Sequence, residues 1–145
     1  MLIAIGSDHG GFRLKEEIKQ LMGEMNIQFR DFGTYSTDSV DYPEISRNVG
    51  QAVANGECTR GIIICGTGIG VAIAANKIKG IRAALCHDVF SAQMSREHND
   101  ANILTMGERV IGFGLARAVA EKWLTTEFAG GRHARRVCQI SDLEA

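Results

Sequence analysis

The sequence predicts an α/β protein with three α/β/α layers, in which helices cover both faces of a five-stranded, mainly parallel sheet. Short apolar runs alternate five times with longer segments whose apolar residues recur at three- and four-residue spacings, the pattern of successive strands and helices. The third run, residues 61–65, is a continuous apolar stretch typical of a strand buried on both faces. No linker, repeat or low-complexity tract divides the 145 residues, so we expect one domain over residues 1–145.

The first strand comprises the apolar residues 2–5, and a glycine-rich turn at 6–11 separates it from a helix. That helix begins near Phe12, and its apolar residues as far as Met22 are spaced to form one face. Residues 27–32 alternate apolar and polar side chains, as expected for an edge strand, and a polar loop follows.

Pro43 begins the next helix, because its missing N–H costs nothing in the first turn. The buried strand then leads through a glycine loop into an Ala-rich helix, which we expect to end near residues 79–80. The last elements alternate in the same way: a strand at 81–86, a helix at 88–98, a strand at 103–106 and a helix at 113–124. Parallel strands need long right-handed crossovers, and these helices supply them, so the domain is Rossmann-like. The order of the fourth and fifth strands stays open.

Charge and composition exclude several classes of protein. The 16 Lys and Arg against 17 Asp and Glu give a net charge of −1, which argues against chain-wide attraction to nucleic acid or an anionic membrane. With 45% hydrophobic residues and no apolar run near the roughly 18–20 residues of a membrane span, we expect neither disorder nor membrane insertion. The N-terminus has no signal-peptide pattern and the four cysteines lack zinc-ligand spacing, so we expect a cytoplasmic protein with reduced thiols and no metal.

The most restrictive motif is Cys65 followed by the glycine loop 66–70, at the carboxyl end of the third strand, where open parallel sheets bind ligands. Glycines let a ligand oxygen approach the unpaired N–H groups at the start of a helix, so the loop could hold an anion or an oxyanion. The same N–H groups would favour a thiolate at Cys65. The alternative, a buried structural cysteine, stays open on these residues alone.

The residue pattern of this motif disfavours two other functions. A cysteine phosphatase needs an arginine at the position that Val71 occupies here. A dinucleotide-binding fingerprint needs the spacing GxGxxG, whereas Gly70 follows Gly68 after a single residue. A non-catalytic module that holds a nucleotide phosphate is a second hypothesis, although it gives Cys65 and Tyr42 no role.

Two more motifs could bind or react, and each also has a purely structural interpretation. Asp8 and His9, after the first strand, suit acid/base or phosphate-binding chemistry, or only a helix cap and a tight turn. His98 and Asn99 suit the same chemistry, although a histidine at a helix C-terminus needs no ligand to explain it.

The C-terminal segment, about 125–145, is polar and basic, with room for one more short helix. Arg132 and Arg136 are four positions apart, as a phosphate clamp on one side of a helix requires, whereas most basic clusters are only solvated. Without Arg132, Arg135 and Arg136 the chain has 13 basic against 17 acidic side chains, so the near-zero total hides a local +3.

Taken together, the motifs resemble the type B ribose-5-phosphate isomerase family, which also contains galactose- and allose-6-phosphate isomerases. The resemblance spans about residues 1–137, and it depends on the joint order and spacing of five motifs. They are Gly6-Ser7-Asp8-His9-Gly10-Gly11, Asp41-Tyr42-Pro43, Cys65-Gly66-Thr67-Gly68-Ile69-Gly70, His98-Asn99 and Gly107-Glu108-Arg109.

The resemblance implies a metal-free and cofactor-free interconversion of ribose 5-phosphate and ribulose 5-phosphate through a cis-enediolate. It implies that Cys65 is the base and that Thr67 relays a proton between the substrate oxygens, while His98, with Asp8, opens the sugar ring. The residues implied in substrate binding, including the N–H groups that replace a metal, are His9, Tyr42, Gly66, Gly68, Ile69, Gly70, Asn99, Arg109, Arg132 and Arg136. It further implies a homodimer with shared active sites, in which the basic segment packs on the partner subunit. A tetramer is the other assembly that stays open. A hexose 6-phosphate is the alternative substrate, because one sequence does not reveal the depth of a pocket.

Overall fold

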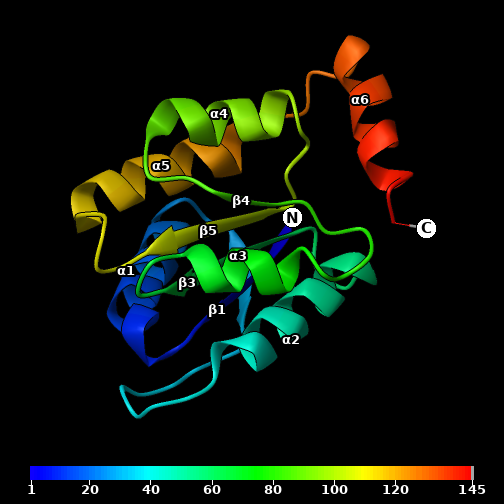
Figure 1. Ribbon diagram of the computed structural model, residues 1–145. Coiled ribbons are helices and arrows are strands. Elements are labelled where there is room, and N and C mark those ends of the chain that lie inside the picture. The colour runs from blue at the N-terminus through cyan, green and yellow to red at the C-terminus, as the bar shows by residue number, and fades with distance from the viewer. Residues whose placement is uncertain (145) are drawn as a thin grey trace.

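A five-stranded parallel sheet forms the centre of the structure, a computed structural model that describes residues 1–144 (Figure 1). The strands lie in the order β2-β1-β3-β5-β4, so β5 separates β3 from β4 and the order left open by the sequence is settled. The predicted Rossmann-like α/β class is confirmed. The strands are β1 (Leu2–Ser7), β2 (Gln28–Asp31), β3 (Arg60–Cys65), β4 (Ala83–Leu85) and β5 (Ile103–Gly107).

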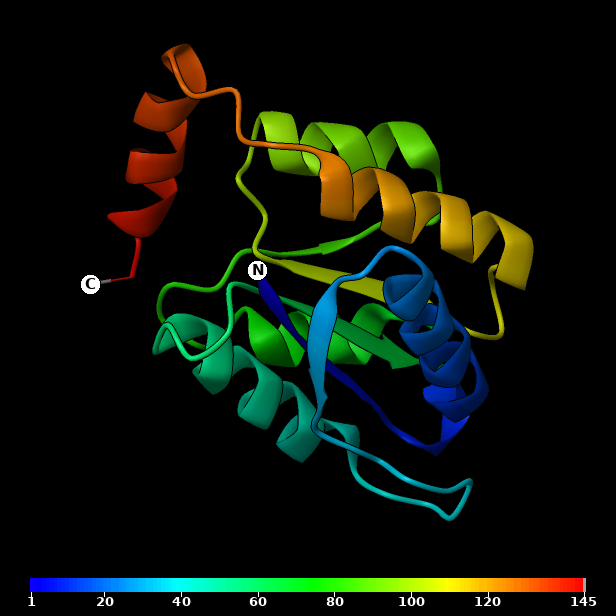
Figure 2. The same ribbon diagram turned by 180° about the vertical axis from the view of Figure 1, so that it is seen from behind.

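Helices cover both faces of this sheet (Figures 1 and 2). One face packs against α1, α4 and α5, and the other against α2 and α3, each over its own apolar cluster. A short 3-10 helix, η1 (His9–Gly11), leads into α1. The α-helices are α1 (Phe12–Glu24), α2 (Tyr42–Ala54), α3 (Ile69–Ala75), α4 (Val89–Glu97), α5 (Phe113–Thr125) and α6 (Arg132–Ser141).

The central strand β3 is buried along its whole length, as its apolar sequence predicts. It pairs with β1 on one side and with β5 on the other. Ile62 and Ile64 belong to the cluster under α1 and α5, while Ile63 and Cys65 belong to the cluster under α2 and α3. The register aligns Cys65 with Gly107 at the end of β5, so both strands end at the same edge.

Two predicted boundaries are wrong, and one side chain explains both. Helix α3 ends at Ala75 instead of residues 79–80, and β4 covers only three residues instead of 81–86. The amide of Asn76 accepts a hydrogen bond from the Ala83 N–H at 2.8 Å and donates one to the Ala83 carbonyl at 3.0 Å. This side chain closes the loop between the two elements, and Gly80 turns within it at a φ of 89°.

Helix α6 lies apart from both helical layers (Figures 1 and 2). It confirms the predicted helix in the basic segment, and none of its residues is buried. Residue 145, the end of that predicted segment, lies outside the described residues. No described helix has the length and apolar character needed to cross a membrane.

Candidate active site

Three loops meet at the carboxyl edge of the sheet, after β1, β3 and β5. Asp8 follows β1, and its carboxylate caps η1 by accepting a hydrogen bond from the Gly10 N–H at 2.9 Å. Its own N–H donates to the carbonyl of Ile64 in β3 at 3.3 Å. A Cβ placed on Gly10 would lie 3.3 Å from the nitrogen of Gly66, so the first and second loops are in contact. Asp8 is therefore both the helix cap and a neighbour of the Cys65 loop.

Cys65 ends β3, and its side chain faces its own glycine loop. The Sγ atom accepts a hydrogen bond from the N–H of Gly68 at 3.1 Å, and only 5% of the residue is exposed. An N–H donor aimed at the sulfur stabilises negative charge on it, as a base requires. Two other cysteines are buried elsewhere in the fold, and burial raises the pKa of Cys58 and of Cys86, which keeps those two thiols protonated.

The glycine loop is held in place from β5. The hydroxyl of Thr105 donates to the Gly68 carbonyl at 2.9 Å, and the N–H of Arg109 donates to the Gly66 carbonyl at 3.0 Å. Gly68 has a φ of 77°, and a Cβ there would lie 2.7 Å from the carbonyl carbon of Met106. Glycine is therefore required at this position, both by its backbone conformation and by its packing.

Two side chains pack against this loop, and His9 lies in η1, beside the first loop. A Cβ on Gly70 would lie 2.5 Å from Cζ of Tyr42, and one on Gly66 would lie 3.4 Å from Nη1 of Arg109. His9 accepts a hydrogen bond at Nδ1 from the Val40 N–H at 3.2 Å. The neutral ring consequently carries its proton on Nε2, where it can donate to a ligand.

The other predicted site residues lie at the amino edge of the sheet. Helix α4 begins after β4 and returns to the opposite edge, where His98 caps its C-terminus next to Asn99. The His98 ring stacks on His133 of α6, with centroids 4.2 Å apart and an interplanar angle of 11°. Arg132 and Arg136 belong to the same helix as His133.

The predicted residues thus form two groups at opposite edges of one chain. Because β3 has six residues, roughly 15–20 Å separates the Cys65 group from the His98 group. The carboxyl-edge group contains Asp8, His9, Tyr42, Cys65, Gly66, Thr67, Gly68, Ile69, Gly70 and Arg109. The amino-edge group contains His98, Asn99, Arg132 and Arg136.

The structure adds two histidines that the sequence did not single out. His87 follows β4 at the carboxyl edge and accepts a hydrogen bond at Nε2 from the Gly107 N–H at 2.9 Å. Burial lowers the pKa of His87, which keeps the ring neutral, and nearby Asp88 opposes that shift. His133 stacks on His98, and burial together with the charges of His98, Arg132 and Arg136 lowers its pKa. The position of His87 directly after a strand was an available signal, whereas the stack joins residues too distant in sequence to foresee.

No group of three or more His, Cys, Asp or Glu side chains within residues 1–144 is placed to hold a metal ion. A cavity of about 430 Å³ lies at the amino edge, beside Asn99 and Arg82, with Ile140 and Leu143 on its other side.

Comparison with known proteins identifies the class to which this fold and these motifs belong. The profile of a family described as ribose/galactose isomerase matches residues 3–140. The chain is 59% identical over 145 residues to a putative sugar phosphate isomerase, YwlF, of Bacillus subtilis, covering 99% of this chain and 97% of that protein. It is 49% identical to ribose-5-phosphate isomerase B of Escherichia coli, covering 98% and 95% of the two chains.

A solved structure of ribose-5-phosphate isomerase B from Clostridium thermocellum superposes with a TM-score of 0.98 at 56% identity, over 99% of this chain and 97% of that one. The chain belongs to the ribose/galactose isomerase family, a family of aldose–ketose isomerases. The resemblance to its type B ribose-5-phosphate members is confirmed.

Proposed function

We propose that this protein interconverts ribose 5-phosphate and ribulose 5-phosphate, with Cys65 as the base. The observation that carries the proposal is the Cys65 sulfur, which lies at the carboxyl edge of the sheet and accepts the Gly68 N–H at 3.1 Å. Two relatives whose names specify this substrate match the chain over nearly its full length.

Isomerisation moves a proton between C1 and C2 of the open-chain sugar. The Cys65 thiolate removes the C2 proton of the aldose, and the electrons form an enediolate whose charge develops on O1. Backbone N–H groups of the glycine loop stabilise that charge. The Thr67 hydroxyl, which accepts the Ile69 N–H at 3.2 Å, passes the O2 proton to O1. Return of the proton from sulfur to C1 completes the ketose.

The cyclic form of ribose 5-phosphate must open before this chemistry. In the proposal His98 protonates the ring oxygen, while Asp8 accepts the proton of the O1 hydroxyl. Since His98 lies at the amino edge and Asp8 at the carboxyl edge, one site needs two copies of the chain. We therefore infer a homodimer in which each site combines the carboxyl edge of one copy with the amino edge of the other.

The phosphate group of the substrate takes no part in the reaction, but it provides a charged group that this shared site can bind. His9 and Arg109 lie at the carboxyl edge, and Arg132 and Arg136 approach from α6 of the second copy. Four donors of this kind suit a dianionic phosphate, whose binding energy positions the sugar. Tyr42, packed on Gly70, and Asn99 hold sugar hydroxyls in this arrangement.

The direct test replaces the base. Cys65→Ala should lower the rate of ribose 5-phosphate isomerisation by about 10²–10⁴-fold, because no other group takes the C2 proton. Calorimetry should show that sugar-phosphate binding persists. Cys58→Ala is the matched control, since Cys58 is also buried but lies in the loop before β3. Unchanged turnover in Cys65→Ala would refute the base assignment.

A substrate panel tests the sugar. Coupled assays with ribose 5-phosphate, allose 6-phosphate and galactose 6-phosphate should give the highest kcat/KM for the pentose. Preference for a hexose would contradict the proposed substrate while leaving the chemistry intact. Binding of ATP or NAD without binding of any sugar phosphate would instead favour a nucleotide-binding module.

A further inference from the structure

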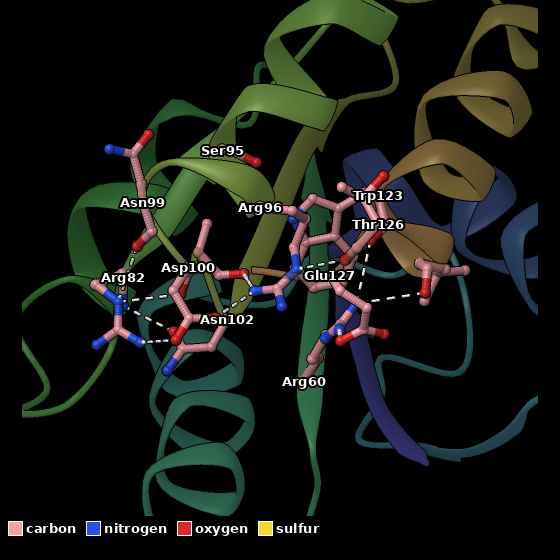
Figure 3. Close-up of polar contacts among 12 residues, drawn as sticks. Arg60, Arg82, Ser95, Arg96, Asn99, Asp100, Asn102, Trp123, Thr126 and Glu127 are labelled. Atoms are coloured by element: carbon pink, nitrogen blue, oxygen red, sulfur yellow. Dashed lines mark hydrogen bonds and ion pairs between the residues drawn. The ribbon is translucent and has the colours of Figure 1, made fainter. Parts of the chain in front are cut away.

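The turn that follows α4 is held by a dense set of polar contacts around Asp100 (Figure 3). Asp100 has a φ of 46°, in the left-handed region that non-glycine residues seldom adopt. Its N–H donates to the Arg96 carbonyl at 3.2 Å, and the Ala101 N–H donates to the Ser95 carbonyl at 2.9 Å. These bonds close the turn that follows the end of α4 at Glu97.

Two arginines bind the Asp100 carboxylate from different elements. Arg96 of α4 donates from Nη1 to Oδ1 at 2.9 Å, and Arg82, which precedes β4, donates from Nη2 to Oδ2 at 3.3 Å. Arg82 also donates from Nε to the carbonyls of Asn99, at 3.2 Å, and of Asp100, at 3.0 Å. The Asn99 side chain points away from Arg82, while its carbonyl faces it (Figure 3). The contacts therefore fix the backbone from which the side chains of His98 and Asn99 project.

The same Arg96 reaches the segment that leads to α6. Its Nε donates to the Thr126 carbonyl at 3.1 Å, and the Ala129 N–H donates to the Glu97 carbonyl at 3.1 Å. The position of α6 is thus tied to the end of α4, on which His98 sits. The stack of His98 on His133 joins the two elements directly.

Charge balance gives the Asp100 carboxylate a second role. Arg60 and Arg96 are almost fully buried and flank Trp123, with guanidinium carbons 5.6 and 5.9 Å from its ring. Burial, and then the charge of Arg96, lower the pKa of Arg60, and Glu127 and Asp100 oppose that shift. Removing the carboxylate would leave the buried guanidinium of Arg96 without its ionic partner.

We propose that Asp100, held by Arg82 and Arg96, is a positioning residue that fixes His98 and its stack with His133 for opening of the sugar ring. The inference rests on the proposed function, in which His98 opens that ring. A glycine at this position would adopt the left-handed backbone at less cost. The turn itself therefore does not require Asp100. What the carboxylate adds is a common acceptor for Arg82 and Arg96.

The test compares Asp100→Gly with Asn26→Gly. Each substitution puts glycine at a left-handed position after a helix, because Asn26 has a φ of 57°, but only the first removes a carboxylate that holds the His98 turn. Asp100→Asn keeps one acceptor oxygen and should retain part of the function. Arg82→Lys keeps the charge but not the forked donors, and it is the second variant should Asp100→Gly fail to fold.

At saturating substrate concentration, the need for ring opening distinguishes the kcat values of the two reaction directions. Ribulose 5-phosphate carries its phosphate on O5 and cannot close a furanose ring, so only the reaction from ribose 5-phosphate begins with a cyclic substrate. The kcat from ribose 5-phosphate should fall about tenfold or more in Asp100→Gly, because a misplaced His98 opens the ring poorly. The kcat from ribulose 5-phosphate should fall by less than about threefold, with KM values shifting to preserve the equilibrium constant.

A second measurement needs no activity. Stacked imidazoles shift each other's ring-proton resonances, so the NMR signals of His98 and His133 report the stack. These signals should move to unstacked positions in Asp100→Gly and stay in place in Asn26→Gly. An unchanged stack, or an equal loss of kcat in both directions, would overturn the positioning role. A wild-type protein inactive on both pentose phosphates would instead refute the proposed function, and the NMR comparison would still decide whether Asp100 positions His98.

Discussion

Gly107 controls how closely β5 can approach the loop that carries Thr67. A Cβ at Gly107 would lie 2.4 Å from the Thr67 carbonyl carbon, closer than any side chain tolerates. The N–H of Gly107 also donates to His87, so its backbone has little freedom to move away. At this scale a single methyl group is enough to displace the proposed proton relay.

Gly107→Ala should therefore lower kcat about 100-fold by shifting Thr67 and the loop N–H groups, with a smaller effect on phosphate binding. The control is Gly114→Ala in α5, where a Cβ meets nothing within 4 Å. That control should keep wild-type activity and gain up to about 1 kcal/mol of stability. Steady-state kinetics and urea unfolding of both variants check this, and a Gly107→Ala enzyme with normal kcat would contradict it.

Spacing along the chain identified residues whose partners are close to them in sequence. Cys65 precedes its own glycine loop, and Asp8 accepts from Gly10 two positions later, so spacing alone reveals them. Arg82 and Asp100 meet across 18 positions, and His98 meets His133 across β5, α5 and the segment that follows α5. Such pairs exist only after the chain has folded.

The elements around β2 depend on a buried charge. The ammonium of Lys15 in α1 is fully buried and lies 2.8 Å from Oδ1 of Asp31, while Lys19 lies 2.9 Å from Oδ2. Lys15 also donates to the Thr34 carbonyl, which ties the loop before α2 to α1. The sequence predicted these elements from their apolar spacing, but nothing in that spacing showed that an ion pair joins them.

Asp31→Ala should lower the free energy of unfolding by about 3–5 kcal/mol at pH 7, because it leaves Lys15 buried without its partner. The control is Glu57→Ala, whose pair with Arg30 is exposed and contributes about 0–1 kcal/mol. Urea unfolding at a fixed protein concentration measures both. Equal urea midpoints for the two variants would contradict a stabilising role for the Lys15–Asp31 ion pair.

The same pair predicts a pH dependence. Burial alone would raise the pKa of Asp31, but hydrogen bonds from Lys15, the Gly33 N–H and Lys19 leave that pKa below its ordinary value. The carboxylate therefore contributes its full stability above the unfolded-state pKa of about 3.9, and loses it as the pH falls through the lower folded-state pKa. The gap between wild type and Asp31→Ala should be constant near neutral pH and narrow below about pH 4. A stability gap that widens on acidification would show that folding does not lower the pKa of Asp31.

For the whole molecule, the central feature is the division of the proposed site residues between two edges of one sheet. The fold class could be predicted because the alternation of strands and helices produces a pattern of apolar residues that the sequence shows directly. The division follows from the crossover helix α4, which returns His98 to the edge opposite Cys65. Motif order alone did not reveal it, because His98 and Cys65 are related by topology and not by spacing.

A complementation experiment tests the proposed shared site most directly. Cys65→Ala and His98→Asn subunits, differently tagged and produced together, should each form dimers inactive from ribose 5-phosphate. In a mixed dimer one site receives both substitutions and the other receives neither. An equal mixture should then recover about a quarter of the wild-type rate, since half of the dimers are mixed and each has one intact site. A mixture as inactive as its parents, despite purified mixed dimers, would show that Cys65 and His98 do not act in one site shared between two copies.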